Sequence, residues 1–332
     1  MESLVAAQPG IAYEIIVVDD HSNDHTRAIA SSFPGVKVVA AAPLPPGWTG
    51  KTNAVTCGAQ EARGEWLLFT DADTVHKPGS VARALAEAKQ RGVALLSYSP
   101  EQEVRSIVEK SVMPVIFAEL ATRYQPAEVS DPTSDAAAAN GQYILISREA
   151  YDAVGGHAAV AGSLLEDVDL ARAVKRSGRK IFFRLGADQV RTRMYRTTTQ
   201  LIEGWTKNLV LLFPSPRKLA FLRVAEFTAI WGSGLLALAA LWRGSFLLAV
   251  SAFALCGILK SFFLHRILRA HFSWESNILA IFGLPIFAYL LLRSVISYRH
   301  GRVAWKGRSY TAAQPPDKLK HKPEMPHSNT SL

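Results

Sequence analysis

The stretch EIIVVDDHSND, residues 14–24, decides how the first half of the chain is interpreted. Its apolar run predicts a strand, and the run ends in two carboxylates, Asp19 and Asp20. In open α/β folds, ligands bind at the carboxyl ends of the sheet strands, where carboxylates can accept hydrogen bonds from a nucleobase or a ribose. The same two aspartates could equally do no more than cap the helix that follows.

Apolar runs and helical patterns alternate outward from this stretch. Further candidate strands, and the candidate helices between them, are read from this alternation. The strands are Glu14–Val18, Val36–Ala40, Trp66–Thr70, Val93–Tyr98, Tyr143–Ser147 and Lys180–Phe183, and the helices are Asp24–Ser32, Thr52–Ala62, Ser80–Gln90, Arg148–Val154 and Asp167–Ser177. Near-continuous apolar strands separated by helices indicate a mostly parallel sheet covered on both faces. The sequence therefore predicts an α/β domain over residues 1–215.

A second acidic motif, TDADT at residues 70–74, also follows an apolar run directly. Asp71 and Asp73 would point two hard oxygen ligands toward one space, which suits Mg²⁺ or Mn²⁺ held by one or two carboxylates and by substrate phosphates. Such a metal would neutralise the charge that builds on a diphosphate leaving group. By itself, a D-x-D pattern is more often only a turn.

A third acidic motif, LLEDVDLA at residues 164–171, opens a helical stretch with Glu166 and Asp167. One interpretation is a general base that removes a proton from an acceptor hydroxyl. The alternative is that acidic side chains merely favour the N-terminus of a helix, where the backbone dipole is positive. By itself, a motif of this kind is more often structural.

The amino-acid composition of the chain becomes strongly apolar after residue 216. Three apolar runs, Leu219–Leu241, Ser245–Leu264 and Ile278–Ser297, each approach the length of about twenty residues that crosses a bilayer. We therefore expect a membrane region over residues 216–298 with about three hydrophobic helices. The tail over residues 299–332 is basic and Pro-rich, and we expect it to be disordered or bound to a membrane surface.

The composition of the chain further narrows the possible partners and kinds of site. The 332-residue chain carries a net charge of +9, which fits an anionic partner such as a phosphorylated substrate or an acidic lipid leaflet. Nucleic acid is not expected, because the basic residues cluster beside the apolar runs and lack aromatic interleaving. The two cysteines, Cys57 and Cys256, lie in different regions and predict neither a disulfide framework nor a zinc site.

Taken together, the three acidic motifs resemble those of family 2 glycosyltransferases, which have the GT-A fold, a Rossmann-like α/β domain. Four further stretches resemble the branch that glycosylates lipids, including carotenoid-acid and hopanoid-associated glycosyltransferases. They are PLPPGWTGKTNAV (43–55), GQYILISREAYDAVGGH (141–157), RMYRTTTQLIEGWTKN (193–208) and AWKGRSY (304–310). The resemblance covers roughly residues 12–310.

The resemblance implies roles for five residues around the donor. Asp20 would contact the uracil of a nucleotide-sugar, and Asp19 would support the same pocket. Asp73 would hold the metal, whereas Asp71 would bond to the sugar or the ribose. Lys51 lies in a G-K-x-N stretch that the resemblance places near the nucleotide.

On the acceptor side, the resemblance makes Asp167 the catalytic base beside Glu166. Processive and ceramide-type relatives carry a Q-x-x-R-W motif that caps the donor diphosphate and the acceptor. Here Gln200 and Trp205 stand one residue further apart, with glycine where arginine is expected, so the diphosphate contact could pass to another cation. The candidates are Arg193, Arg196 and Lys207. Trp205 could instead be an interface anchor.

The start of the chain departs from the family pattern. The family begins with an apolar strand and a turn, and by this resemblance we expect roughly one β–α unit to be absent here. We therefore expect the sequence to be an N-terminally shortened version of a longer protein.

The resulting expectation is a multi-pass enzyme of the cell membrane with a cytoplasmic catalytic domain. It would move a sugar from a nucleotide-sugar, UDP-hexose by resemblance, to a lipid or isoprenoid acceptor with inversion. A helix over Thr199–Phe213 would guide the acceptor. Three crossings would, however, place the basic tail on the opposite face from the catalytic domain, against the positive-inside tendency. Either one of the three segments lies in the interface or re-enters, or the basic tail breaks the rule. A processive polysaccharide synthase and a non-catalytic membrane protein remain the alternatives.

Overall fold

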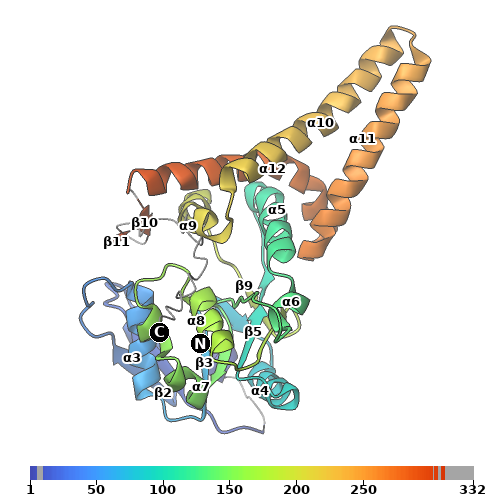
Figure 1. Ribbon diagram of the computed structural model, residues 1–332. Helices are drawn as coiled ribbons and strands as arrows, with labels where there is room; N and C mark the ends of the chain where they lie inside the picture. Colours follow the sequence, from blue (N-terminus) through green and yellow to red (C-terminus); the bar gives the residue numbers. More distant parts are fainter. Residues whose placement is uncertain (6–9, 302, 306–307, 311–332) are drawn as a thin grey trace, which may run out of the picture.

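The computed structural model describes residues 1–5, 10–301, 303–305 and 308–310. An α/β domain forms one end of the molecule, and long helices form the other (Figure 1). Three of these helices, α5 (Ile107–Arg123), α9 (Thr198–Leu212) and α12 (Trp274–Arg299), lie across the top of the α/β domain and are called the roof helices. Two more, α10 (Pro216–Trp242) and α11 (Phe246–Ile267), form a hairpin that projects away from the roof helices.

The α/β class expected from the sequence is confirmed, and the predicted strands and helices of this domain agree with the observed ones to within about two residues. The strands are β1 (Ile15–Asp19), β2 (Val36–Ala40), β3 (Trp66–Phe69), β4 (Thr74–His76), β5 (Leu95–Ser99), β6 (Glu101–Gln102), β7 (Ile144–Ser147), β8 (Ile181–Leu185) and β9 (Val190–Thr192). The helices are α1 (Glu2–Val5), α2 (Thr26–Ser31), α3 (Gly50–Glu61), α4 (Ser80–Arg91), α6 (Pro126–Ser130), α7 (Arg148–Ala153) and α8 (Glu166–Arg176), with a short 3₁₀ turn at η1 (Gly156–Val160). A second 3₁₀ turn, η2 (Leu268–Ala270), follows α11 outside this domain.

The central sheet has the strand order β3-β7-β5-β8 and is mixed rather than mostly parallel. Strand β5 runs parallel to β8, but β7 is antiparallel to both of its neighbours, with Leu96 opposite Leu145. The chain between β5 and β7 leaves the sheet through α5 and α6 and re-enters it from the other end. The sequence pattern could not show this reversal, because parallel and antiparallel buried strands both appear as apolar runs.

Helices cover both faces of the central sheet, as the sequence predicted. On one face, Leu95, Ile144 and Ile146 pack against Leu170 and Val174 of α8. On the other face, the alternate strand residues pack against the small residues of α4; these are Leu96, Tyr98, Tyr143 and Leu145 with Ala84 and Ala88. The alternation arises because successive side chains of a strand point to opposite faces.

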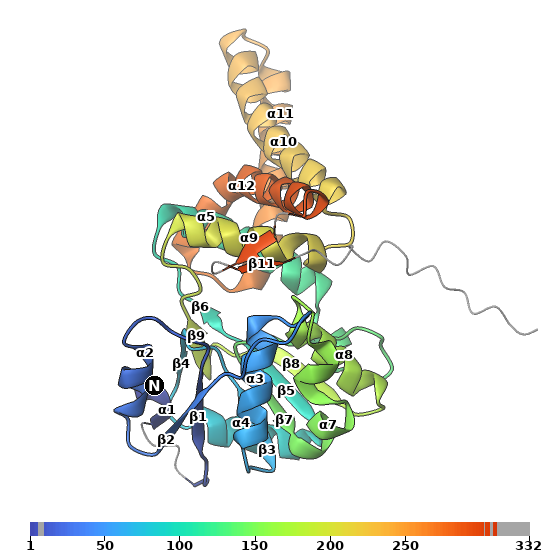
Figure 2. The same ribbon diagram turned by 90° about the vertical axis from the view of Figure 1, so that its left-hand side faces the viewer.

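Strands β1 and β2 form a separate parallel pair, with Val17 opposite Val38, and α3 packs against β1 (Figure 2). Among the described residues, β1 has no other strand partner. A third sheet has the order β4-β9-β6. The absence of one β–α unit relative to the family stays a prediction.

The roof helices share one hydrophobic core with the start of α10 and the end of α11. Helix α5 was not expected from the sequence, since its apolar residues are buried around most of its circumference and Pro114 interrupts the helical pattern. Its start does carry a recognisable signal, S-x-x-E at residues 106–109. The Ser106 hydroxyl accepts from the Glu109 amide at 3.2 Å, and the Glu109 carboxylate accepts from the Arg105 amide at 2.8 Å.

An ionic cluster connects the hairpin to α5 at its base. Glu119 of α5 lies 3.1 Å from Arg223 of α10 and 3.5 Å from Arg266 of α11. Glu226 pairs with the same two guanidinium groups, at 2.8 Å from Arg266. Because buried charges are costly when one partner is missing, the four side chains hold both hairpin helices against the roof as a unit.

The three apolar runs predicted after residue 216 are helices α10, α11 and α12, each long and apolar enough to cross a membrane. The predicted disorder of residues 299–332 does not hold for their first part, since β10 (Val303–Trp305) and β11 (Arg308–Tyr310) pair as antiparallel strands. The rest of that prediction lies outside the described residues.

Helix α12 lies against the backbone of α5 at Gly283. A Cβ atom on Gly283 would lie 2.0 Å from the Ser111 carbonyl oxygen, so Gly283→Ala must push the two helices apart. We expect this substitution to destabilise the protein by about 1–3 kcal/mol, the range usual for overpacking. Thermal unfolding in detergent would measure the change. Gly257→Ala on α11 is the matched control, because nothing lies within 4 Å of a Cβ atom there; an equal effect of both substitutions would contradict the prediction.

Candidate active site

The amino group of Lys51 lies between two of the predicted acidic motifs. It is 3.0 Å from Asp71 Oδ1 of the D-x-D motif and 2.9 Å from Glu166 Oε1 at the start of α8. A small pocket surrounds this contact. It is lined by Lys51, Val55, Phe69, Thr70, Asp71, Gly141, Ile144, His157, Glu166 and Asp167. The structure therefore brings the second and third motifs together, although about ninety residues separate them in the sequence.

Local hydrogen bonds at the start of α3 hold Lys51 in this position. Thr49 caps the helix in a reciprocal capping box with Thr52. The Thr52 hydroxyl also donates to the Ala161 carbonyl at 2.6 Å, and the Thr49 amide donates to the same carbonyl at 2.9 Å. These bonds join the first turn of α3 to the glycine-rich loop before α8, so that Lys51 and Glu166 approach each other.

Asp167 is oriented by two backbone amides. Its Oδ2 accepts from Gly141 at 2.9 Å, and its Oδ1 accepts from Val168 at 2.8 Å. Burial and the neighbouring charge of Glu166 raise the pKa of Asp167 to about 6, while Lys51 and the two amides act in the opposite direction. A carboxylate with a pKa in this range is suited to general-base catalysis near neutral pH.

Glu166 and Lys51 both keep their charges. Burial disfavours the charged form of Glu166, but the Lys51 ammonium lowers the pKa of this carboxyl below its usual value. Burial also disfavours the ammonium, but Glu166 and Asp71 together raise the pKa of Lys51 well above its usual value. Glu166 therefore forms an ion pair with Lys51. Of the two adjacent acids, Glu166 and Asp167, it is Asp167 that is suited to exchange a proton.

Gly141 leaves the space in which these groups meet. A Cβ atom at Gly141 would lie 2.7 Å from the Lys51 amino group and 3.4 Å from Asp167 Oδ2. The first of these distances is too short for any side chain, so the glycine allows the close approach. Sequence reasoning did not assign a role to this residue.

The D-x-D motif lies in a turn after β3. The Thr74 hydroxyl donates to the Asp71 carbonyl at 2.6 Å, and the Thr192 hydroxyl donates to the Asp73 carbonyl at 3.2 Å. Asp73 is exposed at the surface of this turn. Among the described residues, no group of three or more His, Cys, Asp or Glu side chains could hold a metal ion. A metal at Asp73 would therefore need most of its ligands from water and a bound diphosphate, as Mg²⁺ commonly does.

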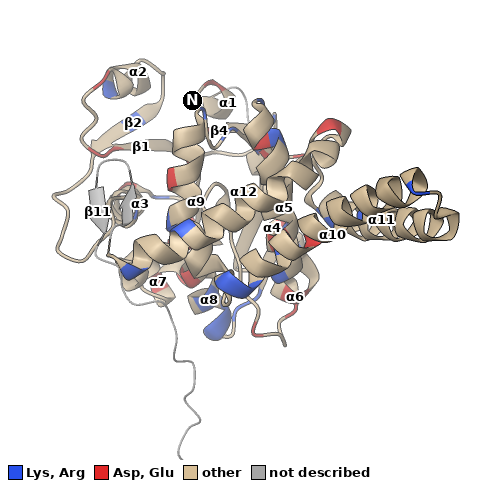
Figure 3. Ribbon diagram, turned by 90° about the horizontal axis from the view of Figure 1, so that it is seen from above, with Lys and Arg blue, Asp and Glu red and all other residues tan. Residues whose placement is uncertain are grey.

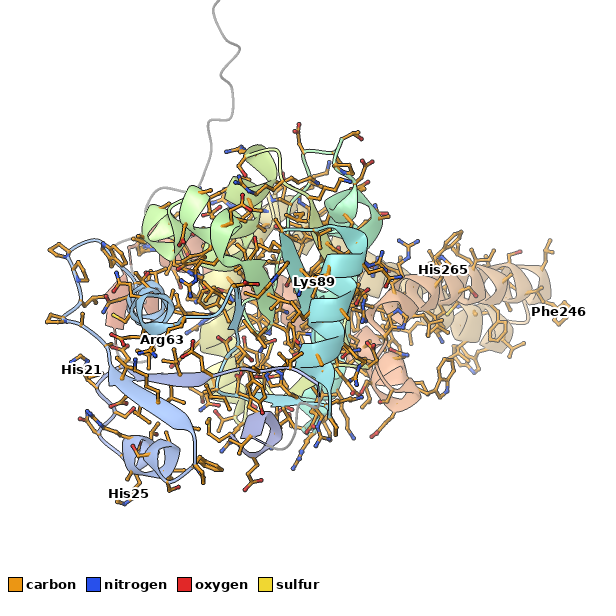
Figure 4. The ribbon with its side chains drawn as sticks, turned by 90° about the horizontal axis from the view of Figure 1, so that it is seen from below. His21, His25, Arg63, Lys89, Phe246 and His265 are labelled. Carbon is orange, nitrogen blue, oxygen red and sulfur yellow. The ribbon has the colours of Figure 1, made fainter. Side chains whose placement is uncertain are left out.

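Asp19 and Asp20 follow β1, as expected. Asp19 is buried, and its hydrogen bonds with Ser22, whose amide lies 3.2 Å from Oδ1, lower its pKa. Asp20 is partly exposed, and its carboxylate lies 3.6 Å from Nδ1 of His21. His21 has a left-handed backbone with φ of 59° and lies at the outer edge of the domain (Figure 4). Asp19 thus stabilises the turn, and Asp20 is the more accessible of the two.

Helix α9 contributes a cation from the roof. Burial lowers the pKa of Lys207, and the negative charges of Glu166 and Asp167 partly offset this effect, which places Lys207 toward the carboxylates. Arg193, in the loop between β9 and α9, has a buried Nε atom without a hydrogen-bond partner in the structure. Such unpaired buried donors are costly unless a ligand or water satisfies them.

The other residues assigned from the incomplete Q-x-x-R-W motif have different surroundings. Gln200 is exposed, and its side chain accepts from the Arg196 backbone amide at 2.9 Å at the start of α9. Trp205 is buried in the roof core, where its indole N–H points to the Met113 sulfur at 3.3 Å. Trp205 therefore packs inside the helical core and does not lie at an open surface.

His157 was missed by sequence reasoning although it follows the Gly155-Gly156 pair. It lines the pocket, its Nδ1 lies 3.0 Å from the Tyr151 hydroxyl, and burial lowers its pKa to about 4. A neutral imidazole at this site can shape the pocket without adding charge. No periodic pattern in the sequence marks a histidine of this kind.

Comparisons with known proteins indicate the family to which this chain is similar. The family model described as Glycosyl transferase family 2 matches residues 1–155, which include Lys51 and the D-x-D motif. A 4,4'-diaponeurosporenoate glycosyltransferase of Staphylococcus aureus (strain USA300) is 25% identical over 321 residues, covering 92% of this chain and 83% of that protein. The enzyme of the same name from Staphylococcus haemolyticus (strain JCSC1435) is 29% identical over 213 residues, covering 62% of this chain and 56% of that protein.

Among solved structures, glucosyl-3-phosphoglycerate synthase from Mycobacterium tuberculosis, in complex with Mn²⁺, UDP-glucose and phosphoglyceric acid, superposes with a TM-score of 0.40. It is 20% identical, and the match covers 64% of this chain and 72% of that one. A likeness of this size carries no argument about ligands. The family match and the mixed α/β sheets agree with the expected GT-A-like fold. Residues 1–155 are therefore a family 2 glycosyltransferase domain, and the protein is a glycosyltransferase.

Proposed function

We propose that this glycosyltransferase is membrane-bound and moves a hexose from a UDP-sugar to a lipid or isoprenoid acceptor, with inversion at the anomeric carbon. One observation carries the proposal. The pocket lined by Lys51, Asp71 and Asp167 lies in the α/β domain, and Lys207 of helix α9 interacts electrostatically with Glu166 and Asp167. Helix α9 is packed into the same core as the base of the apolar hairpin. A polar donor site and an apolar helical region thus meet at α9.

The donor would lie along the strand ends. Asp20 would accept hydrogen bonds from the uracil, with Asp19 supporting the turn, and Asp71 would bond to the sugar or the ribose. Asp73 would hold Mg²⁺ or Mn²⁺, which offsets negative charge on the diphosphate when bound. The unpartnered Nε of Arg193 and the amino group of Lys207 supply positive charge on the roof side.

Asp167 would act as the base. It accepts the proton of an acceptor hydroxyl or carboxyl group while the acceptor oxygen attacks the anomeric carbon. The bond from that carbon to the diphosphate oxygen breaks in the same step, which inverts the configuration. Glu166 stays ionised beside Lys51 and raises the proton affinity of Asp167, since like charges in one site oppose a second ionisation.

An amphiphilic acceptor fits the surroundings of the site. The relatives are named for an acid of carotenoid type, and three helices here are apolar enough to cross a membrane. Nucleotide-sugars are made in the cytosol, so we place the catalytic domain on the cytoplasmic face of the cell membrane. The acceptor would reach Asp167 from the bilayer past α9.

Cells that express the full-length protein should accumulate a lipid that control cells lack. We expect mass spectrometry of lipid extracts to show a hexose-sized increase on one lipid class. Cells that express Asp167→Asn at the same level are the matched control, because this variant keeps the fold but loses the base. Identical lipid profiles in the two strains would contradict the proposed acceptor class.

The transfer rate should depend on the ionisation of Asp167. A base is active only when deprotonated, so with a pKa of about 6 the rate should be constant above neutral pH and fall about tenfold per pH unit below pH 6. Steady-state rates of the purified protein between pH 5 and 8 would measure this profile.

The Asp167→Asn variant separates catalysis from binding in the same assay. We expect it to lower transfer by about 10²–10⁴-fold and to leave UDP-sugar binding nearly unchanged, since the amide cannot take the proton. An equal loss of transfer and of donor binding would show that Asp167 has a structural role instead.

Asp73→Asn should weaken metal-dependent donor binding. We expect calorimetry with UDP to show tighter binding by the wild type in Mn²⁺ than in EDTA, and this gain should largely disappear in the variant. Asp24→Asn, an exposed aspartate in the turn after β1, serves as a control for the loss of one surface charge. If Mn²⁺ does not strengthen UDP binding by the wild type, the assignment of a metal to Asp73 is wrong.

A further inference from the structure

The three apolar helices do not have equivalent surroundings. In α10 and α11, 22% of the most apolar window of each helix is buried, whereas in α12 the share is 50%. The hairpin formed by α10 and α11 projects away from the molecule, but α12 runs across its base over α5 and α9 (Figure 1). Length and composition qualify all three helices to cross a bilayer, so their placement must decide which of them do.

Both ends of α12 are attached to roof helices beside the α/β domain. Near its start, Glu275 accepts a hydrogen bond from Lys110 at 2.7 Å, and Lys110 lies in the first turn of α5 just after β6. At its end, the Tyr298 hydroxyl donates to the Lys207 carbonyl at 2.8 Å. A membrane-spanning helix of this length would have its two ends about 39 Å apart along the membrane normal. The observed contacts leave both ends next to one domain.

The middle of α12 also lies along the roof. The Ser294 hydroxyl donates to the Thr206 carbonyl at 2.7 Å and accepts from the Val210 amide at 3.0 Å, both on α9. Gly283 lies directly against the backbone of α5 at Ser111. The buried side of α12 is thus occupied by protein from one end to the other.

The opposite side of α12 carries a continuous exposed apolar stripe, called the α12 stripe. It consists of Ile278, Phe282, Tyr289, Leu292 and Ile296, each between 44% and 58% exposed. Their spacing follows the helical repeat, so the five side chains lie along one face. One face of α12 is therefore covered by protein along its length, and the other face offers an apolar surface that can contact lipid.

The hairpin has the features of a spanning pair. Large apolar side chains of α10 and α11 are exposed over most of its length, and no charge occurs between Phe227 and Trp242. Phe246 lies at the far tip and is 72% exposed, whereas His265 lies nearer the base (Figure 4). Arg243 is the basic residue at the tip of the hairpin, whereas several basic residues lie at its base. They are Arg217, Lys218, Arg223, Arg266 and Arg269 (Figure 3).

We propose that only α10 and α11 cross the bilayer, and that α12 lies in the plane of the interface with the α12 stripe in contact with lipid. Two crossings return the chain to the face from which it started. The α/β domain and the end of α12 at Arg299 therefore lie on the same face. The excess of basic residues at the base of the hairpin identifies that face as the cytoplasmic one.

This arrangement removes the conflict between a cytoplasmic catalytic domain and a basic C-terminal segment. The arrangement also fixes the depth of the candidate site relative to the membrane. Because α9 is bonded to α12 through Ser294 and Tyr298, the α12 stripe would hold Lys207 at a constant depth below the lipid headgroups. This placement in the membrane does not depend on which donor and acceptor the enzyme uses.

Three single cysteines in the full-length chain test the number of crossings. In a background with Cys57→Ser and Cys256→Ala, cysteine replaces Lys89 on α4, Ser245 at the hairpin tip or His300 after α12, all exposed positions. Lys89 lies on the face of the α/β domain away from the roof helices (Figure 4). A membrane-impermeant maleimide is then applied to intact cells and to permeabilised cells.

We expect Ser245→Cys to react in intact cells, and Lys89→Cys and His300→Cys to react only after permeabilisation. Reaction of both Ser245→Cys and His300→Cys in intact cells, with Lys89→Cys protected, would show a third crossing by α12 and overturn the two-crossing proposal. Reaction of all three on one face would show that the hairpin does not cross. Reaction of Lys89→Cys and His300→Cys in intact cells, with Ser245→Cys protected, would overturn the cytoplasmic orientation.

Depth measurements test the in-plane position of α12. Spin labels at Ile278, Phe282, Leu292 and Ile296, in the purified protein in vesicles, should show similar relative accessibility to oxygen and to a polar nickel complex. A spanning helix would instead show a depth maximum near its centre and polar values at its ends. Labels at Phe246, Phe253 and Phe262 of α11 are the matched control, and we expect the maximum at Phe253. A maximum along α12 like that along α11 would overturn the proposal.

Discussion

The site depends on one interaction, the ammonium of Lys51 held between Asp71 and Glu166. Without this cation, three carboxylates would share a confined pocket, and the desolvation and repulsion of that charge would be costly. With it, Glu166 stays ionised, and the charge of Glu166 in turn raises the pKa of Asp167. A single lysine therefore connects the D-x-D turn to the start of α8 and assigns different protonation behaviour to two adjacent acids.

The roof helices connect this site to the apolar part of the molecule. Helix α9 carries Lys207 toward the carboxylates and buries Trp205 in the core that it shares with α5 and α12. At the base of the hairpin, Glu119 and Glu226 pair with arginines from both hairpin helices. Any tilt of the hairpin relative to α5 would separate the ion pairs of Glu119 with Arg223 and Arg266, so the candidate site and the apolar helices are connected through α5 and α9.

The positions of Asp19, Asp71 and Asp167 could be located from the sequence because each follows an apolar run or opens a helix, and both features are readable over a few residues. Their roles stay predictions. Sequence reasoning failed for Gly141 and His157, whose importance comes from neighbours far away in the chain. The incomplete Q-x-x-R-W motif gave mixed results. Lys207 lies toward the site, whereas Trp205 serves the core and Gln200 serves the start of α9.

The sequence by itself determined the α/β class, the acidic motifs and the three apolar helices, because periodicity, helix length and strand-end positions are properties of short segments. Only the tertiary structure decided the antiparallel entry of β7, the pairing of Lys51 with Glu166 and the direction of α12. Each of these depends on contacts between segments distant in the sequence. An apolar helix has the same composition whether it crosses a bilayer or lies along it, and the bonds at Glu275 and Tyr298 distinguish the two arrangements here.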